Sequence, residues 1–132
     1  LGSCIGLAVW HPRLARGVLC HVVLPEGRPE PGDPPARFAA TAVAWALAQL
    51  PGPASTLVAK MAGGANLFPL AAGLPQLEIG RRNVEAVRAA LAAAGVPLVA
   101  EHVGGRCGRT VLFSADDGRL GVRPVGGRLT WL

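Results

Sequence analysis

This chain of 132 residues is poor in charged and aromatic residues, and each shortage narrows the possibilities. Charged residues make up 16% and aromatic residues 5%, tyrosine is absent, and Lys60 is the only lysine. With 51% hydrophobic residues, the composition argues against a disordered chain and provides for a core. No uninterrupted apolar run reaches about 18 residues, so we expect no transmembrane helix. The sequence also opens without a basic segment, so we expect no signal peptide.

The positive charge of the chain is carried almost wholly by arginine. The formal net charge is +5 and the pI is about 10.5. The arginines are scattered, and no block of five like charges occurs. We therefore interpret the arginine as a compositional bias of the source genome and expect no nucleic-acid partner.

Cysteine is also scarce. The three cysteines, Cys4, Cys20 and Cys107, leave one unpaired in any intramolecular pairing. Their spacing matches no zinc-binding pattern. A reducing, cytoplasmic setting fits best, and one of the three thiols is a candidate reactive group.

Apolar runs separated by glycine and proline predict five or six strands and two helices. We expect strands at residues 1–10, 17–24, 56–61, 98–102, 109–113 and 120–124. Helices are expected at 36–50, with Asp33 as the N-cap, and at 83–94, and residues 67–77 are expected to form an irregular loop. Strands and helices do not alternate strictly, which favours an α+β fold.

Cys4 and His21 lie on the two strands of the first expected hairpin, and its register decides whether they meet. Opposed residues of an antiparallel pair have position numbers with a constant sum, and side chains alternate between faces. A sum of 25 places the two residues directly opposite one another. A sum of 27 places them diagonally on one face, and an even sum separates them. Cys20, next to His21, must point to the other face, but the sequence leaves the register open.

A cysteine beside a histidine is a candidate nucleophile pair, because imidazole can take the thiol proton and later protonate a leaving group. Gly2 and Ser3 allow a substrate to approach closely, and backbone N–H groups there are candidate oxyanion donors. The alternative is a small buried cysteine and an ordinary strand histidine. A metal site of Cys4, His21 and His102 is a further alternative.

The segment Gly63–Asn66 also has two interpretations. Gly64 and Asn66 are candidates for a pocket that receives a substrate amide. The other interpretation, which we favour, is a buried turn in which Asn66 caps backbone groups.

Five segments, in a fixed order, resemble the CheD family of chemoreceptor glutamine deamidases. Leu1–Cys4 resembles the family's nucleophile segment, and Gly17–Pro25 resembles its histidine strand. The other three are the Lys-x-x-Gly-Gly-Ala-Asn-x-Phe stretch at 60–68, the Ile-Gly-x-Arg-Asn start of a helix at 79–83, and the closing strands from 100 to 113. The resemblance extends from residue 1 to about residue 124. Each motif is weak alone, and the five in sequence are specific.

The resemblance implies a mixed and antiparallel β-sandwich-like core with two main helices packed outside, similar to bacterial toxin deamidases. It implies that particular receptor glutamines become glutamate with release of ammonia through a thioester, with Cys4 as nucleophile and His21 as general base and acid. Chemoreceptor cytoplasmic helices are the implied substrate and the phosphatase CheC is an implied partner, with no cofactor, metal or membrane insertion. The alternative is a catalytically weak binding module that regulates CheC.

Three departures from the family pattern stand out. The family's third catalytic residue is a threonine a few positions before the cysteine, and no residue of this chain can carry that role. We therefore expect residues 1–132 to be a single deamidase domain lacking its N-terminal strand. His102 stands where an acid is usual, and Arg82 stands where glutamate is common.

Overall fold

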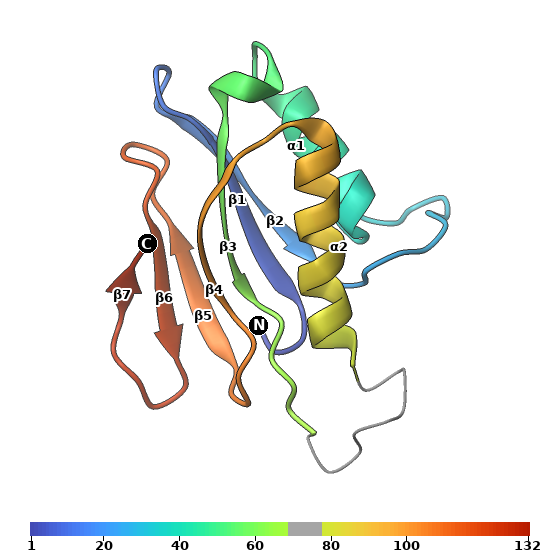
Figure 1. The fold of residues 1–132 in the computed structure, drawn as a ribbon, viewed down its shortest axis with the longest axis vertical. Coiled ribbons are helices and arrows are strands. Elements are labelled where there is room, and N and C mark those ends of the chain that lie inside the picture. The colour runs from blue at the N-terminus through green and yellow to red at the C-terminus, as the bar shows by residue number, and fades with distance from the viewer. Residues whose placement is uncertain (69–77) are drawn as a thin grey trace.

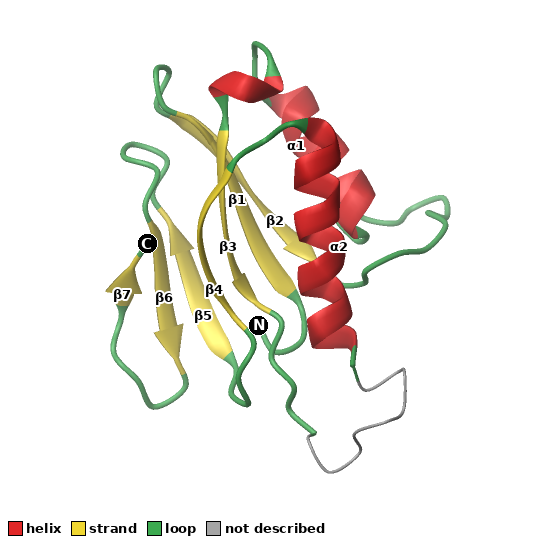
Figure 2. Ribbon diagram, viewed as in Figure 1, coloured by secondary structure: helices red, strands yellow, loops and turns green. Residues whose placement is uncertain are grey.

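The computed structural model describes residues 1–68 and 78–132, and it confirms the α+β class (Figures 1 and 2). In these ranges seven strands form two sheets. The first sheet has the order β2-β1-β3-β4, made of Arg16–Val22, Ile5–His11, Val58–Gly63 and Leu98–Val103. The second has the order β5-β6-β7, made of Arg109–Phe113, Leu120–Pro124 and Thr130–Trp131. The helices are α1, Ala39–Gln49, and α2, Ile79–Ala94, and a 3₁₀ turn spans Ala54–Thr56.

The elements form three layers, with the four-stranded sheet in the middle. Both helices cover one of its faces, and the three-stranded sheet covers the other (Figure 1). Strand β1 pairs antiparallel with both β2 and β3, and β4 joins β3 in parallel after the α2 crossover. The middle sheet is therefore mixed, and β1 is buried on both faces, as a central strand between two layers must be.

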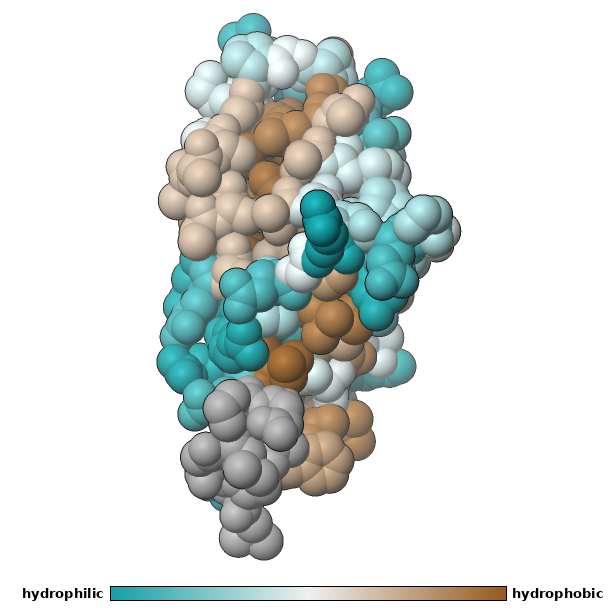
Figure 3. All heavy atoms as spheres, turned by 90° about the vertical axis from the view of Figure 1, so that its right-hand side faces the viewer, coloured by the Kyte–Doolittle hydropathy of each residue, from teal (hydrophilic) through white to brown (hydrophobic). Residues whose placement is uncertain are grey.

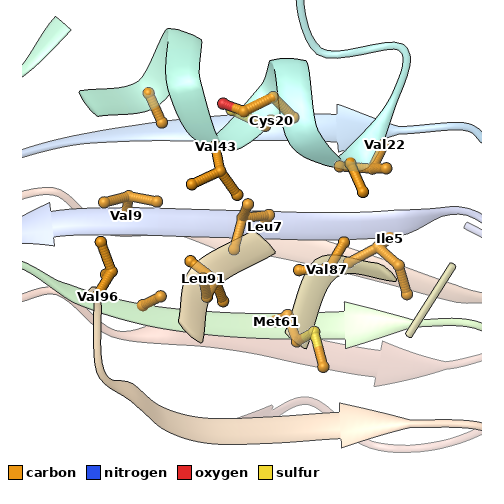
Figure 4. Packing of buried hydrophobic residues seen from close by; sticks show 14 of the residues in the cluster. Ile5, Leu7, Val9, Cys20, Val22, Val43, Met61, Val87, Leu91 and Val96 are labelled. Atoms are coloured by element: carbon orange, nitrogen blue, oxygen red, sulfur yellow. The ribbon is translucent and has the colours of Figure 1, made fainter. Parts of the chain in front are cut away.

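Alternate residues of β1 pack under the helices. Ile5, Leu7 and Val9 are almost fully buried and face Val87 and Leu91 of α2 in the larger core (Figure 4). Val87 and Leu91 are four positions apart on α2, which places them on the same face of that helix. Alternation along β1 and the four-residue spacing on α2 therefore bring these apolar side chains together on this side of the sheet.

Gly6 and Ala8 of β1 are small and face the second sheet. Gly6 and Ala8 alternate with the large apolar residues, and Ala8 packs with Leu120 and Val122 of β6. A Cβ added to Gly6 would lie 3.0 Å from the nearest methyl carbon of Val111, so a larger residue here would push the sheets apart. The small residues at positions 6 and 8 let the sheets approach closely there.

The outer surface of α1 is uncharged, because no side chain of this helix is charged. A hollow of about 310 Å³ between α1 and α2 is lined by alanines together with Val43 and Leu47. This area is the pale to dark brown band on the upper part of the face in Figure 3. In the described parts of the chain, no helix has the length and apolar character needed to cross a membrane.

Most expected elements are confirmed, although several bounds differ. The first strand begins at Ile5 rather than at residue 1, so Cys4 lies before this strand and not on it. Helix α2 begins at Ile79 rather than at 83, and the short strand β7 was not expected. Asp33 is not a helix cap: the cap position of α1 is Phe38, and the Asp33 carboxylate accepts hydrogen bonds from the Glu30 N–H and the Arg37 guanidinium in the preceding turn. Of the expected loop at 67–77, residues 67 and 68 are irregular, and 69–77 lie outside the described residues.

Candidate active site

Cys4 lies immediately before β1, where the middle sheet begins. The Gly64 N–H donates a hydrogen bond of 2.9 Å to the Cys4 carbonyl oxygen, which extends the pairing of β1 with β3 by one residue beyond Ile5 and Gly63. Cys4 is thus tied to the end of β3 although it lies in a bend, and its side chain is half-buried.

His21 lies on β2, an edge strand, and is exposed. The register pairs it with Gly6, so the position numbers of opposed residues sum to 27. Cys4 is two positions before Gly6, and alternation places residues two apart on the same face. The observed register is the one that would place Cys4 and His21 diagonally on one face if β1 continued regularly to residue 4; its paired residues end at Ile5, one position after Cys4.

Cys20 differs from Cys4 in every relevant property. It points into the core beneath α1, its exposed fraction is 2%, and its Sγ lies 3.9 Å from the Ala42 carbonyl oxygen. Burial raises the pKa of the Cys20 thiol to about 11, so it remains protonated at neutral pH. Cys107 is exposed on the loop between β4 and β5.

The thiols of Cys4 and Cys107 are expected to react with a small disulfide reagent before the thiol of Cys20. In the native protein at pH 8, Cys107 and Cys4 should be modified at least about 100-fold faster than Cys20, because only the thiolate attacks. Stopped-flow absorbance measures the rates, and single alanine variants assign each phase. Three equal rates in the folded protein would contradict the placement of Cys20 in the core.

The Gly63–Asn66 segment is held by its backbone against the N-terminal residues. The Ala65 N–H donates to the Gly2 carbonyl oxygen, and the Asn66 N–H donates to the Gly105 carbonyl oxygen, each at 2.9 Å. The Asn66 side-chain oxygen accepts from the Phe68 N–H at 3.1 Å, which is the local bonding of a turn. Since the Gly64 N–H already donates to Cys4, it is not free to hold an oxyanion in this arrangement.

Two cavities lie near these residues. The larger, about 320 Å³, is lined by Gly64 and Asn66 of the predicted pocket, by α2 and by residues 103–105. Neither Cys4 nor His21 lines it. The smaller, about 260 Å³, is lined by His21, Val23, Pro34 and Arg37. The smaller cavity thus adjoins the His21 imidazole.

The alternative metal site is not formed. His102 lies on β4, at the edge of the sheet opposite to β2, so two strands separate it from His21. Its ring is instead engaged by the Arg109 guanidinium, 2.7 Å from the His102 Nδ1. Among the residues that the structure describes, no three histidine, cysteine or acidic side chains gather in a way that could hold a metal ion.

Two buried polar residues near the site were not anticipated. Arg109, 4% exposed, donates to the carbonyl oxygens of His102 and Gly104, and burial lowers its pKa. Asn83, fully buried on α2, donates to the carbonyl oxygens of Ser3 and Val23. A signal for Asn83 was present in the sequence, because it is four positions before Val87 and so shares the apolar face of that helix.

Comparison with known proteins assigns the chain to a protein family. A family model described as "CheD chemotactic sensory transduction" matches residues 23–124. The chain belongs to the CheD family. A relative from Symbiobacterium thermophilum, named "Probable chemoreceptor glutamine deamidase CheD", is 47% identical over 131 residues, covering 96% of this chain and 79% of the relative.

Other members of the CheD family give the same result. A relative of that name from Archaeoglobus fulgidus is 40% identical over 100% of this chain and 85% of its own length. The "Chemoreceptor glutamine deamidase CheD" of Halalkalibacterium halodurans is 37% identical, covering 95% of this chain and 80% of the relative. The resemblance seen in the sequence motifs is thereby confirmed.

Proposed function

We propose that this chain is a cytoplasmic protein-glutamine deamidase of chemotaxis, which converts particular chemoreceptor glutamines to glutamate and releases ammonia. The observation that carries the proposal is the hairpin register, which pairs His21 with Gly6, the residue two positions after Cys4. The names of the CheD relatives supply the substrate class.

The reaction would proceed through a thioester. The imidazole of His21 takes the Cys4 proton, and the sulfur attacks the side-chain amide carbon of the glutamine. Backbone N–H groups of the Gly2–Cys4 segment are the candidate donors to the resulting oxyanion. The C–N bond then breaks as the imidazolium gives its proton to the departing nitrogen, which leaves as ammonia. Water, activated by His21, cleaves the thioester, which yields glutamate and restores the thiol.

The surroundings of the pair suit a macromolecular substrate. His21 is exposed on an edge strand, so a receptor helix can approach it from solvent without the sheet opening. The net charge of +5 favours encounter with acidic, glutamate-rich receptor segments. The half-buried Cys4 requires that the glutamine side chain, rather than the helix backbone, reach inward.

The proposal is tested by incubating the protein with a chemoreceptor cytoplasmic fragment. Mass spectrometry of the fragment is expected to show glutamine converted to glutamate at particular positions, with an equal amount of ammonia released. A fragment in which those glutamines are replaced by asparagine is the control. Absence of conversion, together with binding to CheC, would favour the alternative of a CheC-regulating module.

A further inference from the structure

Asn83 is a polar side chain in an apolar setting. Its exposed fraction is 0%, and it lies on the face of α2 that packs on the sheet, in line with Val87 and Leu91. Asparagine is a weak helix former, and a buried amide is unfavourable unless it is hydrogen-bonded. The Asn83 amide is therefore expected to form hydrogen bonds inside the core.

Both Nδ2 hydrogens of Asn83 are donated to backbone carbonyls just outside the first two strands. One goes to the Ser3 carbonyl oxygen at 2.9 Å and the other to the Val23 carbonyl oxygen at 3.0 Å. Ser3 immediately precedes Cys4, and Val23 follows His21 by two residues. A single side chain thus joins the segment that carries the thiol to the strand that carries the imidazole.

The two acceptors lie where the hairpin no longer holds itself together. The last backbone pair between β1 and β2 is Ile5 with Val22. Beyond it the chain turns away, because the N–H groups of Val23 and Leu24 donate to the Arg37 carbonyl oxygen, each at 3.0 Å. The amide of Asn83 therefore bridges the two strands at the end that bears Cys4.

The orientation of the amide is fixed by its acceptors. Turning it over would place its oxygen against two carbonyl oxygens, so the nitrogen must face them. The oxygen, Oδ1, is then left buried without a hydrogen-bond partner in the described residues. An unpaired buried acceptor is unfavourable, which offsets the gain from the two bonds. The effect of Asn83 is thus expected on the position of the strands more than on the free energy of unfolding.

Helix α2 approaches this region closely enough for the amide to reach. A Cβ added to Gly80, one turn before Asn83, would lie 2.5 Å from the Ala65 carbonyl oxygen and 2.6 Å from that of Gly64. Only glycine at position 80 permits this contact between helix and loop. The Gly80 and Asn83 of the Ile-Gly-x-Arg-Asn motif therefore serve one arrangement.

We propose that Asn83 is a positioning residue for the Cys4–His21 pair, an inference that rests on the proposed deamidase function. It keeps the thiol and the imidazole within reach of one another by fixing the backbone at Ser3, next to Cys4, and at Val23, two residues after His21. Small displacements of reacting groups lower the rate steeply, with a loss of up to about 100-fold for 1 Å.

The test compares Asn83→Leu with Val87→Ala, a core substitution on the same helix that contacts neither strand carbonyl. Asn83→Leu is expected to lower kcat by about 10- to 100-fold with KM changed less than about twofold, whereas Val87→Ala keeps both parameters near the wild type while the protein is folded. In a Cys107→Ser background, the rate of Cys4 alkylation by iodoacetamide is expected to fall by about tenfold for Asn83→Leu alone. Asn83→Ser, which retains one donor, should fall between, and it replaces Asn83→Leu if that variant does not fold.

The possible outcomes separate the two proposals. Equal kcat values, or equal alkylation rates, in Asn83→Leu and Val87→Ala would overturn the positioning role. If the wild type releases no ammonia, the deamidase function fails. The alkylation rates then still decide whether Asn83 positions Cys4, because that reaction needs no receptor.

Discussion

A Cys4→Ala variant is expected to lose glutamine deamidation by roughly four to six orders of magnitude while keeping its fold. The sulfur would form the thioester, and no neighbouring group can replace it: Cys20 points into the helix-covered core, and its pKa of about 11 keeps the thiol protonated. Cys4 is only half-buried and lies outside the two core clusters, so its truncation should affect stability little. The initial rate of ammonia release from a receptor fragment measures the effect.

Cys107→Ala is the matched control for this variant. Cys107 is exposed on a loop, and its loss should leave the rate within about twofold of the wild type. Urea unfolding monitored by circular dichroism checks that both variants fold. Substantial activity in folded Cys4→Ala would show that another group is the nucleophile.

A Gly63→Ala variant is expected to be destabilised by about 3–5 kcal/mol, and so to lose much of its folded population. Gly63 has φ of +128°, a region that residues with a Cβ rarely adopt. The added methyl would also collide with the Cys4 carbonyl oxygen and lie 3.1 Å from the Ile5 Cα. These are backbone atoms where the central strand begins, so they cannot move aside as a flexible side chain would.

Gly95→Ala provides the comparison for Gly63→Ala. Gly95 ends α2 with φ of +75°, but no atom lies within 4 Å of the position that its Cβ would take. Its substitution should therefore cost only the backbone strain, about 1–2 kcal/mol. Urea midpoints measure both values, and equal destabilisation of the two variants would contradict the collision with the Cys4 carbonyl.

The sequence identifies candidate residues for the site but leaves their geometry open. The motifs led to Cys4 and His21, and alternation along a strand showed why Cys20 could not be the partner of His21. The register stayed open because the turn between the strands could close in more than one way. In the structure it closes at residues 12–15, with Ala15 at φ of +48°, a conformation that is unusual for alanine and that no local pattern indicates.

Contacts between distant segments account for what sequence patterns missed. The sequence pattern places Asn83 only at the start of a helix, whereas its amide reaches the ends of two strands about 60 and 80 residues away along the chain. Helix α2 begins at Ile79 because Gly80 packs against the 64–65 backbone, a tertiary contact that overrides the weak helix propensity of glycine. Strand β7 is only two residues long, and it exists through its pairing with β6.

The central claim is that the Cys4 thiol and the His21 imidazole act as a pair on one face of the sheet, and the reactivity of Cys4 tests it most directly. The rate of Cys4 alkylation by iodoacetamide at pH 7 should be measured in a Cys107→Ser background, with and without His21→Gln. Because Cys20 is buried, the measured rate belongs to Cys4. The pair predicts a fall of about tenfold or more when the imidazole is removed, since the thiol then loses its proton acceptor. Equal rates in the two proteins would contradict the pair.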